Sequence, residues 1–109
     1  MASSVIRNPN VVSQISVPSG FSLYKCGRIA ELTIAPNNIQ GQSEGWIPLL
    51  TLPQEARPVV VIFFTSYDNT NRDALIESRI LNSGEVDIYL YADRLSVSPR
   101  SIITYICRD

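Results

Sequence analysis

Short stretches rich in Val, Ile, Phe, Tyr and Thr follow one another along this chain, and each ends at Gly, Pro, Asn or Ser. They recur about every ten residues, a spacing typical of β-sandwiches and β-barrels. β-Branched and aromatic side chains favour strands, whereas Gly and Pro interrupt them. The sequence therefore predicts an all-β fold, an antiparallel β-sandwich of jelly-roll-like type with about seven to eight strands.

A single folding unit is expected. The chain has 109 residues, of which 45% are hydrophobic and 17% charged, so burial can offset the entropy of folding. Residues 1–9 are expected to be a flexible lead-in, and residues 10–109 a single β-sandwich domain. The longest apolar run, residues 59–64, is far shorter than the roughly 20 residues of a membrane-spanning helix. The first residues lack the pattern of a secretory signal, so we expect folding in a cytoplasm and no membrane insertion.

The first half of the chain shows the alternation of half-buried strands. Residues 11–17 are predicted to form a first strand. Residues 21–34 are predicted to form one long strand, because apolar side chains occupy its even positions. These positions are Tyr24, Cys26, Ala30, Leu32 and Ile34. Residues 36–45 have no apolar period and are predicted to be a loop suited to variation or binding.

The middle of the chain contains the most apolar segment. Residues 46–52 are predicted to be a strand, with Pro48 at a sheet edge or a bulge because proline lacks the N–H group. Residues 59–64 are apolar on both faces, so this strand is either covered on both sides or faces another subunit. Residues 66–73 are predicted to be a polar, solvent-exposed connection.

The last third of the chain predicts a hairpin and a final strand. Residues 74–81 fit two helical turns or a strand, and we favour a strand because Asn-Ser-Gly at 82–84 precedes an alternating segment, 86–90. Residues 101–107 are predicted to be the final strand. The outward face of the second hairpin arm is predicted to carry Glu85, Asp87, Tyr89 and Tyr91.

The composition excludes several kinds of chemistry. The chain has no histidine, which removes Ser-His-Asp and Cys-His catalysis and most zinc sites. Cys26 and Cys107 lie too far apart in sequence for a metal-binding pair, and we expect free thiols, with one disulfide as the alternative. Nine basic residues balance ten acidic ones without a basic stripe, so nucleic acid is not an expected partner. We expect no enzymatic activity, no cofactor and no metal.

Two acidic patterns come closest to a catalytic or metal site. The pairs Asp68 with Asp73 and Asp87 with Asp93 suit hydrolysis by paired carboxylates only formally, since acids in turns are usually solvated. Residues 68–73 carry oxygen ligands but lack the glycine and the terminal glutamate of a calcium loop. We interpret this segment as a hydrophilic loop.

Aromatic and planar polar side chains gather in residues 67–72 and 89–94. Such side chains suit saccharides, because an aromatic ring packs on the apolar face of a sugar while polar groups bind its hydroxyls. Tyr89 and Tyr91 fit cross-strand packing equally well, and Trp46 suits the core or a subunit interface better than a ligand site. The candidate ligand-binding residues are Tyr67, Asp68, Asn69, Asn71, Arg72, Tyr89, Tyr91, Asp93 and Arg94.

One ordered set of motifs is more specific. Gly45 and Trp46 open a strand, Leu-Pro-x-x-x-Arg-Pro spans residues 52–58, and Asn-Ser-Gly-Glu-Val spans residues 82–86. In the second motif, Pro53 ends one strand and Pro58 begins the next in an extended conformation. Over residues 21–107 this order resembles the C-terminal head domains of bacteriophage tail receptor-binding and baseplate proteins.

The resemblance implies a homotrimeric head domain at the tail tip of a virion, folded in the host bacterial cytoplasm, that binds a bacterial surface saccharide during host attachment. The interface residues implied are Trp46, Val59, Val61 and Phe63. The alternative is a structural virion assembly module, of baseplate, tail-fibre or decoration type, that binds other virion proteins. A third interpretation, a carbohydrate-binding module of a bacterial enzyme, predicts a monomer and a Pro- or Ser-rich linker that the sequence does not show.

Overall fold

The computed structural model describes residues 11–108, apart from the side chains of Arg72 and Asp73. The predicted lead-in, residues 1–9, lies outside the described residues. The strands are β2 (Ser13–Ile15), β3 (Phe21–Cys26), β4 (Ile29–Ile34), β5 (Ile39–Gln40), β6 (Gly45–Thr51), β7 (Ile62–Asp68), β8 (Asn71–Ile80), β9 (Glu85–Leu90), β10 (Ser96–Val97) and β11 (Pro99–Ile106). All pair antiparallel, and the helical structure of the described part is one short 3-10 turn, η1 (Gln54–Ala56). The predicted all-β, antiparallel class is confirmed.

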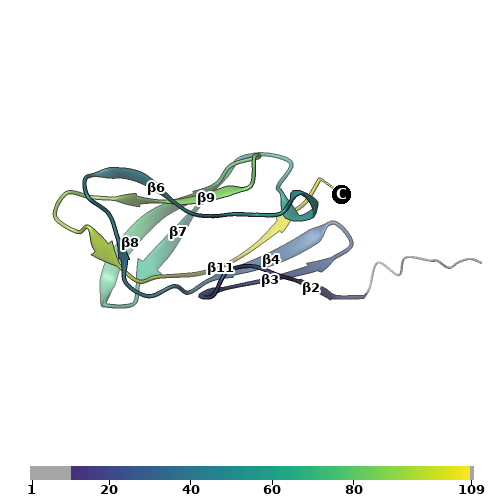
Figure 1. Cartoon of the computed structure of the whole chain (residues 1–109), viewed down its shortest axis with the longest axis horizontal. Coiled ribbons are helices and arrows are strands. Elements are labelled where there is room, and N and C mark those ends of the chain that lie inside the picture. Colours follow the sequence, from purple (N-terminus) through teal and green to yellow (C-terminus); the bar gives the residue numbers. More distant parts are fainter. Residues whose placement is uncertain (1–10, 109) are drawn as a thin grey trace, which may run out of the picture.

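The two layers of this sandwich belong to one sheet. Its eight strands run in the order β2-β3-β4-β11-β7-β8-β9-β6, and β5 and β10 form a separate ribbon. The sheet curls over, so that β6 and β9 lie above β3, β4 and β11 in Figure 1. β11 joins the layers, because residues 101–106 pair with β4 whereas Pro99 and Arg100 pair with β7.

The single long strand predicted for residues 21–34 is wrong, because the chain turns back at Gly27. This residue has a φ of 59°, in the left-handed region that glycine adopts without steric cost. β3 and β4 therefore form a hairpin in which Leu23 pairs with Leu32, and both side chains are buried. The turn also changes the face of the first arm, so Tyr24 is exposed although it was predicted on the same face as Leu32.

The strand predicted at residues 59–64 begins later and ends later than expected. Residues 59–61 lie before β7, and the strand continues to Asp68. The connection predicted for residues 66–73 is therefore wrong, since the turn between β7 and β8 is only Asn69 and Thr70. The odd positions of β7 point outward, and the Phe63 side chain is 69% exposed, so this chain alone does not cover both faces of the segment.

Other elements agree with the sequence. β6 is an edge strand, and its register with β9 shifts between Pro48 and Leu50, which confirms the bulge or edge position expected of this proline. β8 and β9 form the predicted hairpin, and β11 the predicted final strand. No disulfide joins Cys26 and Cys107, and Cys107 is buried as expected, whereas Cys26 is only half-buried.

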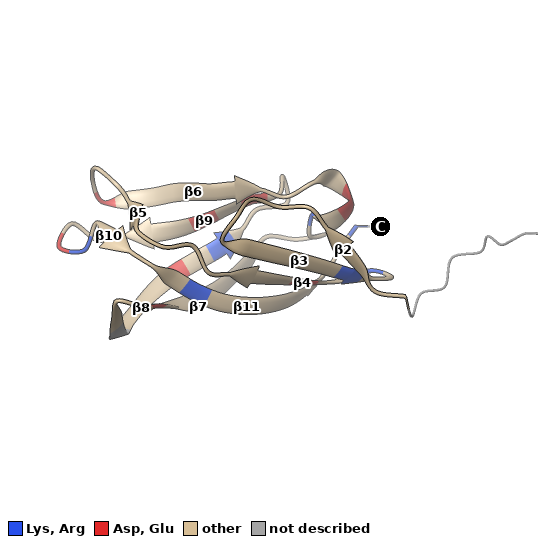
Figure 2. Cartoon of the chain, turned by 60° about the horizontal axis from the view of Figure 1, so that its bottom comes forward, with Lys and Arg blue, Asp and Glu red and all other residues tan. Residues whose placement is uncertain are grey.

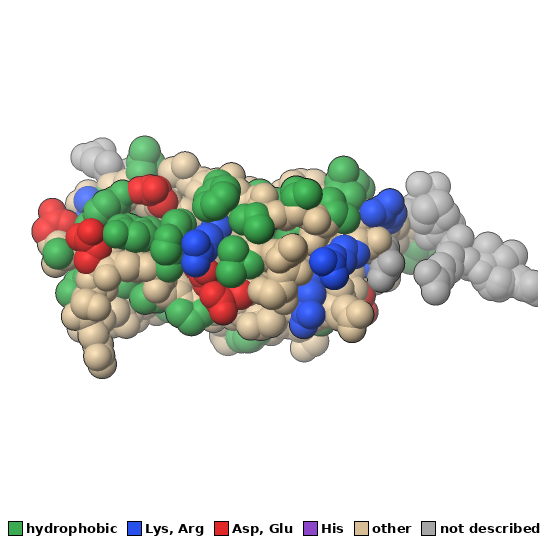
Figure 3. Space-filling model, turned by 90° about the horizontal axis from the view of Figure 1, so that it is seen from above, with side chains coloured by type: hydrophobic (Ala, Val, Ile, Leu, Met, Phe, Trp, Pro, Cys, Tyr) green, Lys and Arg blue, Asp and Glu red, His purple; other side chains and the backbone are tan. Residues whose placement is uncertain are grey.

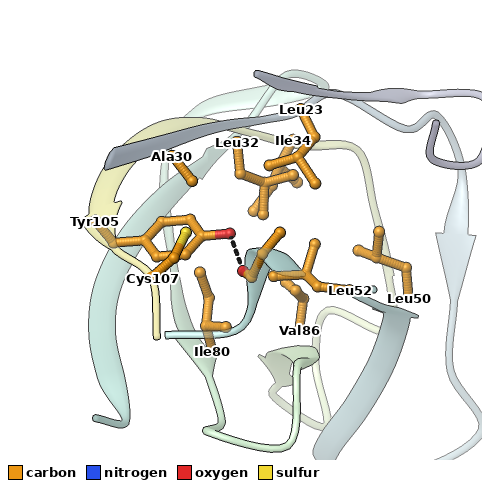
Figure 4. Packing of buried hydrophobic residues seen from close by; sticks show 11 residues of the cluster. Leu23, Ala30, Leu32, Ile34, Leu50, Leu52, Ile80, Val86, Tyr105 and Cys107 are labelled. Carbon is orange, nitrogen blue, oxygen red and sulfur yellow. Dashed lines mark hydrogen bonds between the residues drawn. The ribbon is translucent and has the colours of Figure 1, made fainter. Parts of the chain in front are cut away.

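The core lies between the curled halves of the sheet. Figure 4 shows side chains from β3 and β4 meeting those of β8, β9 and β11, and the largest buried cluster includes Leu23, Leu32 and Leu52. The buried Tyr105 hydroxyl donates a hydrogen bond to the Ala56 carbonyl over 2.6 Å, which ties η1 to β11. Burial of these inward faces leaves the outward faces of β6, β7, β8 and β9 to carry function.

Candidate functional site

Three aromatic rings lie side by side on the outward face of β6 and β9. The even residues of β9 point inward and are buried, so Tyr89, and Tyr91 directly after the strand, point outward. Trp46 in β6 is directly opposite Tyr89 in the antiparallel register. We call Trp46, Tyr89 and Tyr91 the aromatic platform. Figure 3 looks onto this side of the molecule, where hydrophobic, acidic and basic side chains are interspersed.

The rings of the aromatic platform contact one another edge to face. The centroids of Trp46 and Tyr89 are 5.3 Å apart with planes at 82°, and those of Tyr89 and Tyr91 are 5.1 Å apart with planes at 62°. Edge-to-face pairs at such distances are favourable because the positive edge of one ring meets the negative face of the other. The guanidinium of Arg79 in β8 lies 4.1 Å from the centroid of Trp46, a cation–π contact. Packing thus fixes the three rings relative to one another.

Two glutamates hold the tyrosine hydroxyls. The Tyr89 hydroxyl donates to Glu44 Oε2 over 3.0 Å, and the Ala92 amide donates to Glu44 Oε1 over 3.0 Å. The Tyr91 hydroxyl donates to Glu77 Oε1. These hydrogen bonds, with the nearby negative charge, raise the pKa of both tyrosines, so the phenols stay protonated. The platform therefore presents neutral rings bordered by carboxylates.

A buried ion pair lies next to the platform. Asp87 was predicted on an exposed strand face, but its side chain is only 1% exposed. The Nε of Arg79 donates to Asp87 Oδ2 over 2.8 Å, whereas Asp87 Oδ1 is buried and accepts no hydrogen bond from the described residues. The neighbouring Asp87 carboxyl raises the pKa of Glu85, first through hydrogen bonding and then through its negative charge. The pair anchors Arg79 in its position over Trp46.

The ligand-binding candidates in the segment 67–72 lie partly at the surface and partly buried. Tyr67 is 44% exposed, and Asn69 and Asn71 are exposed as well. Asp68, a candidate ligand-binding residue, was predicted to lie in an exposed loop, and this position is wrong, since the residue is 1% exposed. The side chain of Arg72 lies outside the described part of the structure.

Asp68 has a structural role instead. Its Oδ1 accepts hydrogen bonds from Thr70 N, Thr70 Oγ1 and Ser98 N. Burial alone raises the pKa of Asp68, but these hydrogen bonds and the charge of Arg94 outweigh it, so the pKa lies below its ordinary value. Because the charge of Arg94 acts on Asp68, the segments 67–72 and 89–94 lie at the same end of the sheet. Asp93 is exposed there.

Four residues around the two tyrosines were not predicted as binding residues. Trp46 was placed at a core or subunit interface, and Glu44, Glu77 and Arg79 were not candidates. The only available signal was the position of Glu44 in the loop at 36–45, a segment expected to vary or bind. The pairing of β6 with β9 brings Trp46 beside Tyr89, and periodicity within one strand does not report such a contact.

Several features bear on other functions. No group of three potential metal ligands occurs among the described residues, and none of their helices is long and apolar enough to cross a membrane. Figure 2 shows Lys, Arg, Asp and Glu distributed over several strands and turns. No protein-family model matches the chain, and no curated protein gives a significant match.

Proposed function

We propose that the protein is a non-enzymatic saccharide-binding domain that acts as a receptor-binding head of a bacteriophage tail. The observation that carries the saccharide part is the aromatic platform, three adjacent rings on an outward sheet face. The phage setting rests on the resemblance in residues 21–107. In this role the domain recognises a surface saccharide of the host bacterium at the virion tail tip.

The platform suits a saccharide for a physical reason. The apolar face of a sugar ring packs on an aromatic ring, and its hydroxyls need hydrogen-bond partners at the border. Glu44 and Glu77 provide carboxylate acceptors there. Because packing and hydrogen bonds already fix these side chains, binding costs little conformational entropy.

Binding is expected to depend on the rings of Trp46 and Tyr91. On an array of bacterial surface polysaccharides, Trp46→Ala and Tyr91→Ala should each weaken binding by about tenfold, the loss of one ring contact with its buried area. Tyr24→Ala is the matched control, because Tyr24 is exposed at a similar fraction but lies on β3. Thermal unfolding would show that all three variants fold. Unchanged binding by both platform variants would rule out this surface as the saccharide site.

The same proposal includes a homotrimer. Val59, Val61 and Phe63 are exposed in the single chain, together with Ile102 and Ile106 on β11. An apolar surface of this kind on a small protein is typical of an interface. Light scattering on a size-exclusion column should give a mass near three times 12.1 kDa. A mass of one chain would contradict the trimer.

The exposed apolar residues also favour a second function. Phe63 is 69% exposed and Ile102 68% exposed, and neither lies on the aromatic platform. A structural virion assembly module would use this surface to bind other virion proteins. Capture of neighbouring virion proteins, with no signal on the polysaccharide array, would favour this second function over saccharide binding.

A further inference from the structure

We infer that the saccharide, on the premise of the proposed function, is an extended, uncharged oligosaccharide that runs across the strands from the aromatic platform to a hollow beside Tyr67. A row of side chains along the outward face of β9, β8, β7 and β11 sets the length, direction and charge of this ligand.

The row continues from the platform through Leu75. The residue pairs of β8 and β9 end at Ser78 and Ile88, and the same register continued along both segments would bring Leu75 opposite Tyr91. The Tyr91 hydroxyl donates a hydrogen bond to Glu77 Oε1, so the Tyr91 ring reaches β8 two residues from Leu75. Leu75 is 64% exposed, so it adds an apolar step beyond the third ring.

The row ends at a hollow on the far side of β7. Tyr67 pairs with Leu75 on one side and with Arg100 of β11 on the other. Tyr67 and Arg100 line an open hollow of about 380 Å³, with Thr33 and Ile102 among its other walls. The fourth aromatic ring of the row thus borders a space that can hold a sugar ring.

The length of the row sets the length of the ligand. Steps of 5.3 and 5.1 Å lead from Trp46 through Tyr89 to Tyr91. Two strand spacings then lead to Tyr67, so the whole path, followed along the outer surface of the curled sheet, is on the order of 20 Å. One sugar ring covers one aromatic ring, and a monosaccharide cannot contact Trp46 and Tyr67 together. A ligand that uses the full row has several linked sugars.

The charges along the row favour an uncharged chain. The carboxylates of Glu44 and Glu77 border the tyrosines and repel acidic sugars. Two of the described basic side chains beside the row, those of Arg79 and Arg100, already have acceptors. Arg79 pairs with Asp87, and both Nη atoms of Arg100 donate to oxygens of Pro36, Asn37 and Pro99.

The test uses neutral oligosaccharides, and uronic-acid-rich oligosaccharides for comparison, released from bacterial surface polysaccharide by partial acid hydrolysis and separated by charge and by size. Calorimetric titration would compare fractions of about one or two sugars with fractions of about five or more, with Trp46→Ala, Tyr67→Ala and the control Tyr24→Ala. Trp46→Ala should weaken all fractions, whereas Tyr67→Ala should weaken only the long ones, by about fivefold to tenfold. Thermal unfolding of each variant separates a lost contact from a lost fold.

Other outcomes have distinct meanings. If short and long fractions bind equally and Tyr67→Ala changes nothing, the extended site is overturned while saccharide binding by the platform stands. Tighter binding of fractions rich in uronic acids would overturn the uncharged ligand. If no fraction of any size binds, the proposed function itself fails.

Discussion

Replacing Asp68 with alanine is expected to lower the free energy of unfolding by about 2–4 kcal/mol. The substitution removes the acceptor of three hydrogen bonds from Thr70 and Ser98, and leaves the Ser98 amide without its partner in a buried position. These bonds join the β7–β8 turn to the segment that leads into β11. Urea unfolding of the variant and of the wild type would measure the loss.

Two further variants make this prediction specific. Asp68→Asn keeps an acceptor oxygen at the same position, so it should cost clearly less than Asp68→Ala. Asp93→Ala, at an exposed residue, should change stability by less than about 0.5 kcal/mol. Equal losses for Asp68→Ala and Asp93→Ala would contradict the structural role of Asp68.

The contribution of Asp68 to the free energy of unfolding also depends on pH. Its folded pKa lies below the ordinary value of 3.8, so the stabilisation by the carboxylate is complete above that pH. It is lost as the pH falls through the folded pKa, where Asp68 becomes protonated. The stability difference between wild type and Asp68→Asn should therefore shrink below about pH 3.8 and stay constant near neutrality.

Replacing Arg79 with alanine is expected to cost about 2–4 kcal/mol. It leaves the carboxylate of Asp87 buried without a cation, and it removes the cation–π contact with Trp46. This expected loss of stability lies at the lower end of the losses typical of broken buried ion pairs. The reason is that the Arg79 side chain is 24% exposed, so water can approach the pair. Arg108→Ala, at an exposed arginine, is the matched control and should change little.

A double substitution tests whether the cost comes from the unpaired charge. With Arg79→Met and Asp87→Leu together, no charge remains buried, so the combined loss should be smaller than the sum of the two single losses by about 1–3 kcal/mol. Strict additivity, measured by urea unfolding of all four proteins, would mean that the two side chains stabilise the fold independently.

The fold class was predictable because strands and turns are specified by residues that are close together in the sequence. Gly, Pro and Asn mark the turns, and Pro48 correctly indicated the irregular edge strand β6. The error at residues 21–34 came from Gly27, where a strand-like pattern continued across a turn. One glycine with positive φ reversed the chain and changed which side of the pattern was buried.

The site was only partly predictable because its contacts connect distant strands. Tyr89 and Tyr91 could be placed outward by alternation alone. Trp46 joins them only through the β6–β9 pairing, which periodicity within one strand does not determine. Asp68 and Asp87 were expected at the surface because acids usually are, but hydrogen bonds to Asp68 and the ion pair of Asp87 stabilise their charges inside.

The position of β11 in both layers has a consequence for the order in which the protein matures. Hairpins such as β7–β8 contain only local contacts and can form early. β11 pairs with β4, which lies far upstream, and with β7, so neither pairing exists until residues 99–106 have been synthesised. A nascent chain that ends before Pro99 has open edges on β4 and β7, and such edges favour aggregation. Closure of this sandwich is therefore a late step, which can occur only after β11 has been synthesised.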